Sequence, residues 1–103
     1  MIESFIEGRV RLRLSLLADT TLAERVTSEL LKIRGVRKAE ANLRTQGLLL
    51  EYDRTLLPMS LLMKAAPLLS RLDDLTKLPA DKRLAAAVNL IRELREQLAD
   101  EET

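Results

Sequence analysis

The chain of 103 residues contains no cysteine and no histidine. These absences exclude disulfides, thiolate and imidazole metal ligands, a cysteine nucleophile and a histidine general base. A nucleophile would have to be Ser, Thr or Lys beside an activating group, and no spacing of such residues indicates one. We therefore expect that the protein is not an enzyme and carries no cofactor.

Aromatic residues and excess charge of one sign are also scarce. Phe5 and Tyr52 are the only aromatic residues, and 17 Lys and Arg stand against 16 Asp and Glu. Proteins that bind nucleic acids usually have a basic face, and those that bind single strands also expose aromatic rings for base stacking. The composition therefore predicts no nucleic-acid partner.

Long apolar runs are missing too. No stretch approaches the length needed to cross a bilayer, and no charged segment precedes an apolar block at the N-terminus. We expect a cytoplasmic protein that does not insert into a membrane. Its length suits one compact domain, with a core of Leu, Val, Ile, Ala and Met.

The first third of the chain has two clear periodicities. Residues 6–16 alternate between apolar and mostly basic side chains, which predicts one half-buried strand. Apolar residues then recur at helical spacing over 22–33, which predicts an amphipathic helix that ends at Gly35. Thr21 and Glu24 have the spacing of a capping box for that helix.

The middle of the chain predicts a hairpin and a second helix. Strands are expected over 36–43 and 48–53, with Gly47 supplying a permissive backbone in the turn between them. Pro58 suits the first turn of a helix, and Pro67 should kink that helix or end it early. The helix is apolar nearly all round, more than one sheet face can bury, which indicates a further partner surface.

A last helix is expected over about 80–99. Its apolar stripe consists of Leu84, Val88, Ile91, Leu94 and Leu98. The chain thus divides into a domain over 1–75 and an amphipathic helical segment over 76–103. That segment packs either on the domain or on a second subunit.

The order strand, helix, strand, strand, helix predicts an α+β fold. It is a ferredoxin-like βαββα sandwich that lacks the fourth strand and has an added C-terminal helix. The third strand should lie antiparallel to the first, with Leu49 and Glu51 near the arginines of the first strand. Without a fourth strand, the outer edge of the first strand would have unpaired backbone groups.

Residues 22–53 carry a family resemblance. Gly35-Val36 at the start of the second strand, Ala41-Asn42-Leu43-Arg44-Thr45 after it and Tyr52-Asp53 at the end of the third stand where the heavy-metal-associated domain family has similar residues. The chain resembles that family over roughly 6–70. The family's metal-binding cysteine pair belongs in the loop over 15–21, where this chain has none. The resemblance therefore implies a cysteine-free variant, similar to N-terminal domains of bacterial metal-transporting P-type ATPases.

Arg9, Arg11 and Arg13 form the most prominent polar pattern. They could be the solvated face of a strand, with cross-strand carboxylate pairs worth about 0.2–1 kcal/mol each. They could also be an RNA-binding platform, although no aromatic residue lies among them. As a protein-docking surface, the row would use the bidentate pairing that favours arginine at interfaces.

Met59 and Met63 are four residues apart on the second predicted helix. Two thioethers at this spacing share a helix face and could hold Cu(I), but we interpret them as core residues.

Taken with the resemblance, these observations predict a non-enzymatic protein-interaction module in bacterial metal homeostasis. It would self-associate, as a homodimer, or dock to a metal-transporting ATPase or a metal-storage compartment, without thiolate metal binding. The predicted interaction residues are Arg9, Arg11, Arg13, Leu84, Val88, Ile91 and Leu98. The alternatives are a metallochaperone-like protein that binds a metal or small ligand and an RNA-binding ferredoxin-like domain.

Overall fold

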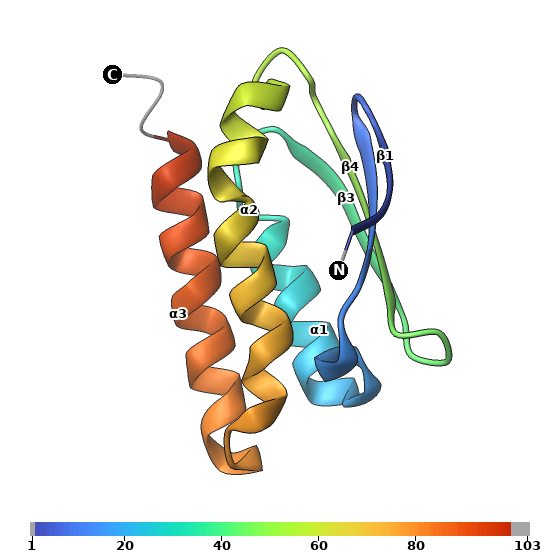
Figure 1. The fold of residues 1–103 in the computed structure, drawn as a ribbon, viewed down its shortest axis with the longest axis vertical. Helices are drawn as coiled ribbons and strands as arrows, with labels where there is room; N and C mark the ends of the chain where they lie inside the picture. Colours follow the sequence, from blue (N-terminus) through green and yellow to red (C-terminus); the bar gives the residue numbers. More distant parts are fainter. Residues whose placement is uncertain (1, 100–103) are drawn as a thin grey trace.

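The computed structural model describes residues 2–99 and has two layers, a sheet and a set of helices that covers one face of it (Figure 1). Residues 100–103, the end of the predicted C-terminal segment, lie outside the described residues. The elements in chain order are β1 (Ile2–Ile6), β2 (Arg9–Arg13), η1 (Ser15–Ala18), α1 (Thr20–Leu30), β3 (Val36–Asn42), β4 (Gly47–Tyr52), α2 (Met59–Asp73), η2 (Asp74–Lys77) and α3 (Ala80–Ala99).

The sheet has the order β1-β2-β4-β3, and all neighbouring strands are antiparallel. The succession β2, α1, β3, β4, α2 confirms the predicted ferredoxin-like βαββα order, and α3 is the added C-terminal helix. Within the described residues no strand follows α2. The position beside β2, which the last strand of a βαββαβ unit would occupy, is filled by β1 from the N-terminus.

The β1–β2 hairpin corrects the prediction of one strand over 6–16. The chain reverses at Glu7 and Gly8, where Gly8 has a φ of +91° that a side chain with a Cβ rarely adopts. Residues 2–6 then pair with β2, so the predicted unpaired outer edge on the arginine strand is wrong. The alternation extends through the turn and hides the reversal, because the turn residues carry no apolar side chain that would break the pattern.

The start of α1 also differs from the prediction. The helix begins at Thr20, and its N-cap is Asp19, whose Oδ1 accepts a hydrogen bond from the Leu22 amide at 3.2 Å. The predicted Thr21–Glu24 capping box is therefore wrong, because the helix already includes both residues. Asp19 is as good a cap as threonine, and it satisfies the same kind of unpaired amide.

The β3–β4 turn lies where it was expected but uses a different residue for its tight bend. Gln46 has a φ of +60°, whereas Gly47 does not have a positive φ. Asn42 Oδ1 accepts hydrogen bonds from the amides of Arg44 and Thr45 at 3.0 and 3.3 Å. This Asx-type contact fixes the turn, so the permissive glycine is not required at its bend.

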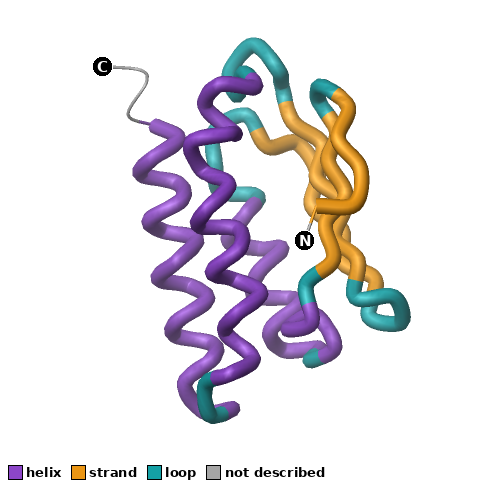
Figure 2. The backbone as a smooth tube through the Cα atoms, in the orientation of Figure 1, coloured by secondary structure: helices purple, strands orange, loops and turns teal. Residues whose placement is uncertain are grey.

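Helix α2 continues past Pro67 to Asp73, so the predicted early end is wrong. Leu68 and Leu72 beyond the proline are buried, and this packing holds the last two turns in place. The buried face of α2 also includes Leu61 and Ala65. Since α2 packs against α3, much of its surplus apolar surface is covered within the same chain (Figure 2).

Helix α3 contacts both α1 and α2. These contacts place the amphipathic segment on the domain of its own chain, one of the two arrangements that the sequence left open. The single core between the layers is almost entirely aliphatic, with Leu12, Leu14, Leu17, Leu30, Leu48, Leu61, Leu72 and Ile91 among its fully buried side chains.

Candidate interaction surface

The arginine row lies on the face of the sheet that the helices leave open. Along β2, Val10 and Leu12 are buried in the core, while Arg9, Arg11 and Arg13 are exposed on the other side. This is the outcome expected for an alternating strand with one covered face. The exposed position of all three arginines on one face agrees with the prediction.

The two outer arginines of the row have carboxylate partners. Arg9 Nε lies 3.9 Å from Glu51 Oε2 on β4, and Arg13 Nε lies 3.3 Å from Glu3 Oε2 on β1. All four side chains are close to half exposed, so water screens both pairs. The predicted proximity of Glu51 to the arginines is confirmed.

Arg11, the central arginine, has a different environment. Its Cα partners are Leu49 on β4 and Ser4 on β1, and neither side chain carries charge. Within residues 2–99, no ion pair of the Arg11 guanidinium is found. Arg11 is thus a charge at the middle of the sheet to which no carboxylate of the described residues is bound.

A shallow hollow of about 370 Å³ lies beside Arg11. Its charged lining residues are Glu3, Arg11 and Glu40, and the polar ones include Asn42 and Thr45. The Glu3 carboxylate is paired with Arg13, and the Glu40 carboxylate lies 3.2 Å from Lys38 Nζ. The hollow therefore offers one unpaired cation and two neutralised anions, a distribution that suits a carboxylate of a partner.

The open face lacks stacking side chains. Tyr52 of β4 is buried in the core, on the face of the sheet that the helices cover, and Phe5 of β1 packs against the same core. These are the two aromatic residues of the chain. Single-stranded RNA is normally held by base–aromatic stacking, so this face has charge but no platform for bases.

The other predicted interaction residues lie on α3 and face their own chain. Ile91 and Leu98 are buried core residues, Leu84 is partly buried against the core, and Val88 is half-buried. The apolar stripe of α3, which was predicted to contact a partner, thus lies on the helix that packs against α1 and α2 of the same chain. Among the predicted residues, the arginine row is the part that remains exposed.

The loop between β2 and α1, where the resemblance would place metal ligands, contributes apolar side chains to the core. Leu16 and Leu17 are buried there. The Ser15 amide and hydroxyl both donate to Asp73 Oδ1, at 3.1 and 3.2 Å, which ties the loop to the end of α2. The loop offers no thiolate, and its apolar side chains point into the core, so its donor set does not fit a soft metal ion.

No group of three or more Asp, Glu, His or Cys side chains able to hold a metal ion occurs in residues 2–99. None of the helices in that part of the chain is both long enough and apolar enough to cross a membrane. Met59 and Met63 on α2 are 45 and 63% exposed, so the interpretation of this pair as core residues is wrong. Leu61, between the two methionines, is the side chain that is buried in the core.

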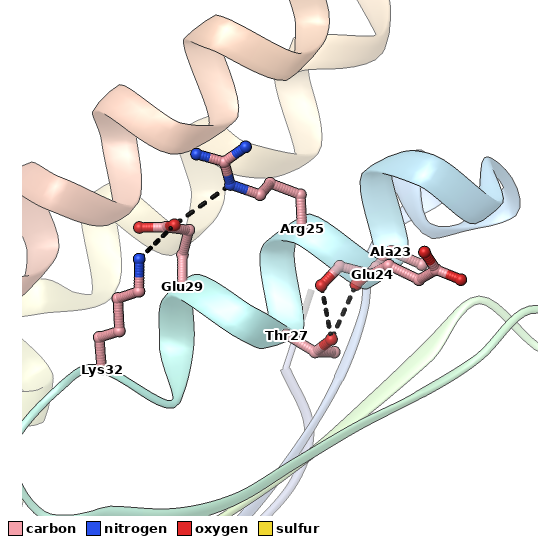
Figure 3. A network of polar contacts seen from close by, with 6 residues as sticks. All are labelled: Ala23, Glu24, Arg25, Thr27, Glu29 and Lys32. Atoms are coloured by element: carbon pink, nitrogen blue, oxygen red, sulfur yellow. Dashed lines mark hydrogen bonds and ion pairs between the residues drawn. The ribbon is translucent and has the colours of Figure 1, made fainter.

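A buried carboxylate lies on the opposite layer, on α1. The Glu29 side chain is 7% exposed and accepts hydrogen bonds from Arg25 Nε at 3.2 Å and Lys32 Nζ at 2.9 Å (Figure 3). The hydrogen bond from Lys32 makes the largest contribution to lowering the pKa of Glu29 below its usual value, and burial opposes it. Arg25 lies on α1 and Lys32 lies two residues beyond its end, so these local contacts stabilise the C-terminal part of α1 and do not form a binding site.

The alternation over 6–16 does not distinguish β1 from β2, so the sequence pattern did not predict a second exposed surface, at β1. Ile2 and Ile6 on β1 are both exposed, and β1 forms one edge of the sheet. Gly8 was the available signal, because a glycine between two β-like segments marks a possible reversal.

Comparison with known proteins identifies one similarity. The family model described as heavy metal associated domain 2 matches residues 1–101. The searches of curated proteins and of solved structures give no match.

Proposed function

Because the chain belongs to the heavy metal associated domain 2 family, we propose that it is a non-enzymatic protein-interaction module of bacterial metal homeostasis. The family links the chain to a metal-related function. The finer proposal is that it acts in the cytoplasm by docking, through the arginine row, to a metal-transporting ATPase or to a metal-storage compartment.

The observation that carries this proposal is the unpaired Arg11 at the centre of the open sheet face. An exposed guanidinium whose neighbours are Ser4 and Leu49 can donate two hydrogen bonds to a carboxylate in bidentate geometry. Arg9 and Arg13 on either side can exchange their own screened carboxylate partners for those of another protein at little cost. The half-buried Leu49 beside Arg11 adds apolar contact.

The residues of the chain also support docking over metal transfer. The β2–α1 loop is closed by Leu16 and Leu17 and contains no thiolate. A metallochaperone for soft metal ions needs accessible thiolate or imidazole ligands that can transfer the ion, and this loop supplies neither.

The test uses the purified chain and the soluble domains of a metal-transporting P-type ATPase from the same organism. We expect saturable binding that weakens with added salt, and an Arg11→Glu variant that binds at least about tenfold more weakly. Arg92→Glu is the matched control, because Arg92 is exposed on α3 in the helical layer. Isothermal titration calorimetry measures all three proteins.

Absence of binding, or equal loss in the Arg11→Glu and Arg92→Glu variants, would contradict docking through the arginine row. Stoichiometric, sub-micromolar binding of Cu(I), Fe(II) or Zn(II) by the purified chain would replace docking by a metal-binding function. Salt-dependent retention on RNA that Arg11→Glu abolishes would replace it by RNA binding.

A further inference from the structure

Strand β1 is held by the rest of the molecule on one side only. It pairs with β2, and no strand of residues 2–99 lies on its other side. In an antiparallel strand, alternate backbone groups point to opposite edges, so those on the outer edge of β1 have no strand partner. Such an edge binds another strand readily unless the protein protects it.

The two edges of the sheet differ in their protection. Strand β3, at the other edge, carries three exposed charged side chains, Arg37, Lys38 and Glu40. They form ion pairs with Asp53 and with each other. Strand β1 carries one charged side chain, Glu3, which is paired with Arg13, and its Ile2 and Ile6 side chains are exposed. Since charged side chains on an edge discourage strand addition, β1 is the less protected of the two edges.

Apolar side chains extend from this edge onto α2. Ile2 and Phe5 of β1 and Met63 of α2 line one small cavity of about 60 Å³ between the sheet and the helices. Its walls are almost wholly apolar, and at its mouth Ile2 and Met63 are 43 and 63% exposed. We call Ile2, Phe5 and Met63 the edge patch. The edge strand and α2 therefore both contribute apolar side chains to the same cavity.

We propose that the edge patch binds a second copy of this chain, with β1 of each copy paired antiparallel to form one sheet across the dimer. The required partner has an unpaired strand flanked by apolar helix surface, and the chain itself has both. Pairing β1 with β1 closes under two-fold symmetry, whereas pairing β1 with the charged β3 edge would leave free edges and propagate. The net charge of +1 gives little repulsion between copies.

This interface is distinct from the arginine row, which lies on the face of the sheet and not at its edge. The dimer proposal does not require a metal-transporting partner. The two proposals can consequently fail independently.

The test is the mass of the purified chain in solution, measured by light scattering after size exclusion and by sedimentation over a range of concentrations. We expect a dimer at high micromolar concentration. Met63→Lys introduces a buried charge at the interface and should raise the dissociation constant at least about tenfold. Because Met63 is largely exposed on a helix, and lysine is a good helix former, the variant should keep its circular dichroism. Its melting temperature should equal that of the original chain at concentrations where both are monomeric.

Leu43→Lys is the matched control, since Leu43 is also an exposed apolar residue but lies at the β3–β4 turn. It should dimerise as the original chain does. Hydrogen exchange supplies a second measurement, in which β1 amides become more protected as concentration rises.

A chain that stays monomeric throughout the concentration range overturns the proposal. So does a dimer that tolerates Met63→Lys, one that Leu43→Lys weakens equally, or one without concentration-dependent protection in β1.

Discussion

At the scale of single residues, the geometry of a few backbone positions decides which substitutions the fold accepts. Gly35 connects the end of α1 to β3 with a φ of +98°, and its carbonyl accepts a hydrogen bond from the Asp53 amide at 2.7 Å. A Cβ at Gly35 would lie 3.1 Å from Leu56 Cβ and from Leu57 Cγ. Gly35 therefore meets both a conformational and a steric requirement.

We expect Gly35→Ala to lower the free energy of unfolding by about 1–3 kcal/mol, because alanine is strained at positive φ and the nearby leucines must move. Urea denaturation followed by circular dichroism measures the change. Gly47→Ala is the control, because Gly47 does not have a positive φ and the nearest atom to a Cβ there would be the hydroxyl of the exposed Thr45. An equal loss in both variants would show that the conformation at Gly35 is not the cause.

At the scale of elements, α1 combines an apolar face with a nearly buried carboxylate. Leu22, Val26 and Leu30 face the core, and Glu29 lies beside them, held by Arg25 and Lys32. The ion pairs on the helix surface are short-range contacts at i,i+4 and i,i+3 spacing. They allow a charged residue to occupy the margin of an aliphatic core.

The pKa of Glu29 is lowered, so its carboxylate favours the folded state above the usual carboxyl pKa, and this contribution is lost as pH falls through the lowered value. Glu29→Gln should reduce the free energy of unfolding by about 1–2 kcal/mol at neutral pH, because two charge-assisted hydrogen bonds are weakened. The difference from the original chain should shrink in acid. Urea titrations at both pH values measure it.

Glu24→Gln serves as the control for this prediction, since Glu24 is exposed on the same helix. It should have little effect at either pH. A difference for Glu29→Gln that persists unchanged in acid would contradict the role assigned to its charge.

At the scale of the whole molecule, the fold keeps two exposed surfaces apart. The helices cover one face of the sheet (Figure 2). The arginine row occupies the open face, and the edge patch lies at β1. A dimer formed along the sheet edge would leave the open face of each copy accessible. Docking and self-association would then be compatible in one assembly.

This arrangement predicts separable variants. Met63→Lys should weaken dimerisation but keep its affinity for the ATPase domains within about twofold of the original chain. The two proteins are compared at concentrations where both are monomeric, because a dimer that binds through two sites would have a higher apparent affinity. Arg11→Glu should lose docking and keep the dimer. Calorimetry and sedimentation on the same samples measure both properties, and loss of both in either variant would contradict two separate surfaces.

The sequence by itself determined the α+β class, the βαββα order and the exposed position of the arginine row. Hydrophobic periods of two and of 3.6 residues report which side chains face a core, and they are strong in β2, α1 and α3. The absence of cysteine determined that no thiolate site could form. These properties depend on local patterns or on composition, which the chain carries before it folds.

Only the tertiary structure decided which edges and faces remain available. The sequence predicted that β2 forms the open edge of the sheet. Because the chain reverses at Gly8 and residues 2–6 pair with β2, the open edge belongs to β1. Strand pairing follows from the path of the chain and not from alternation alone. The packing of α3 on α1 and α2 buried Ile91 and Leu98. An apolar stripe has the same pattern whether it covers its own core or another subunit, so its partner is fixed only when the helices pack.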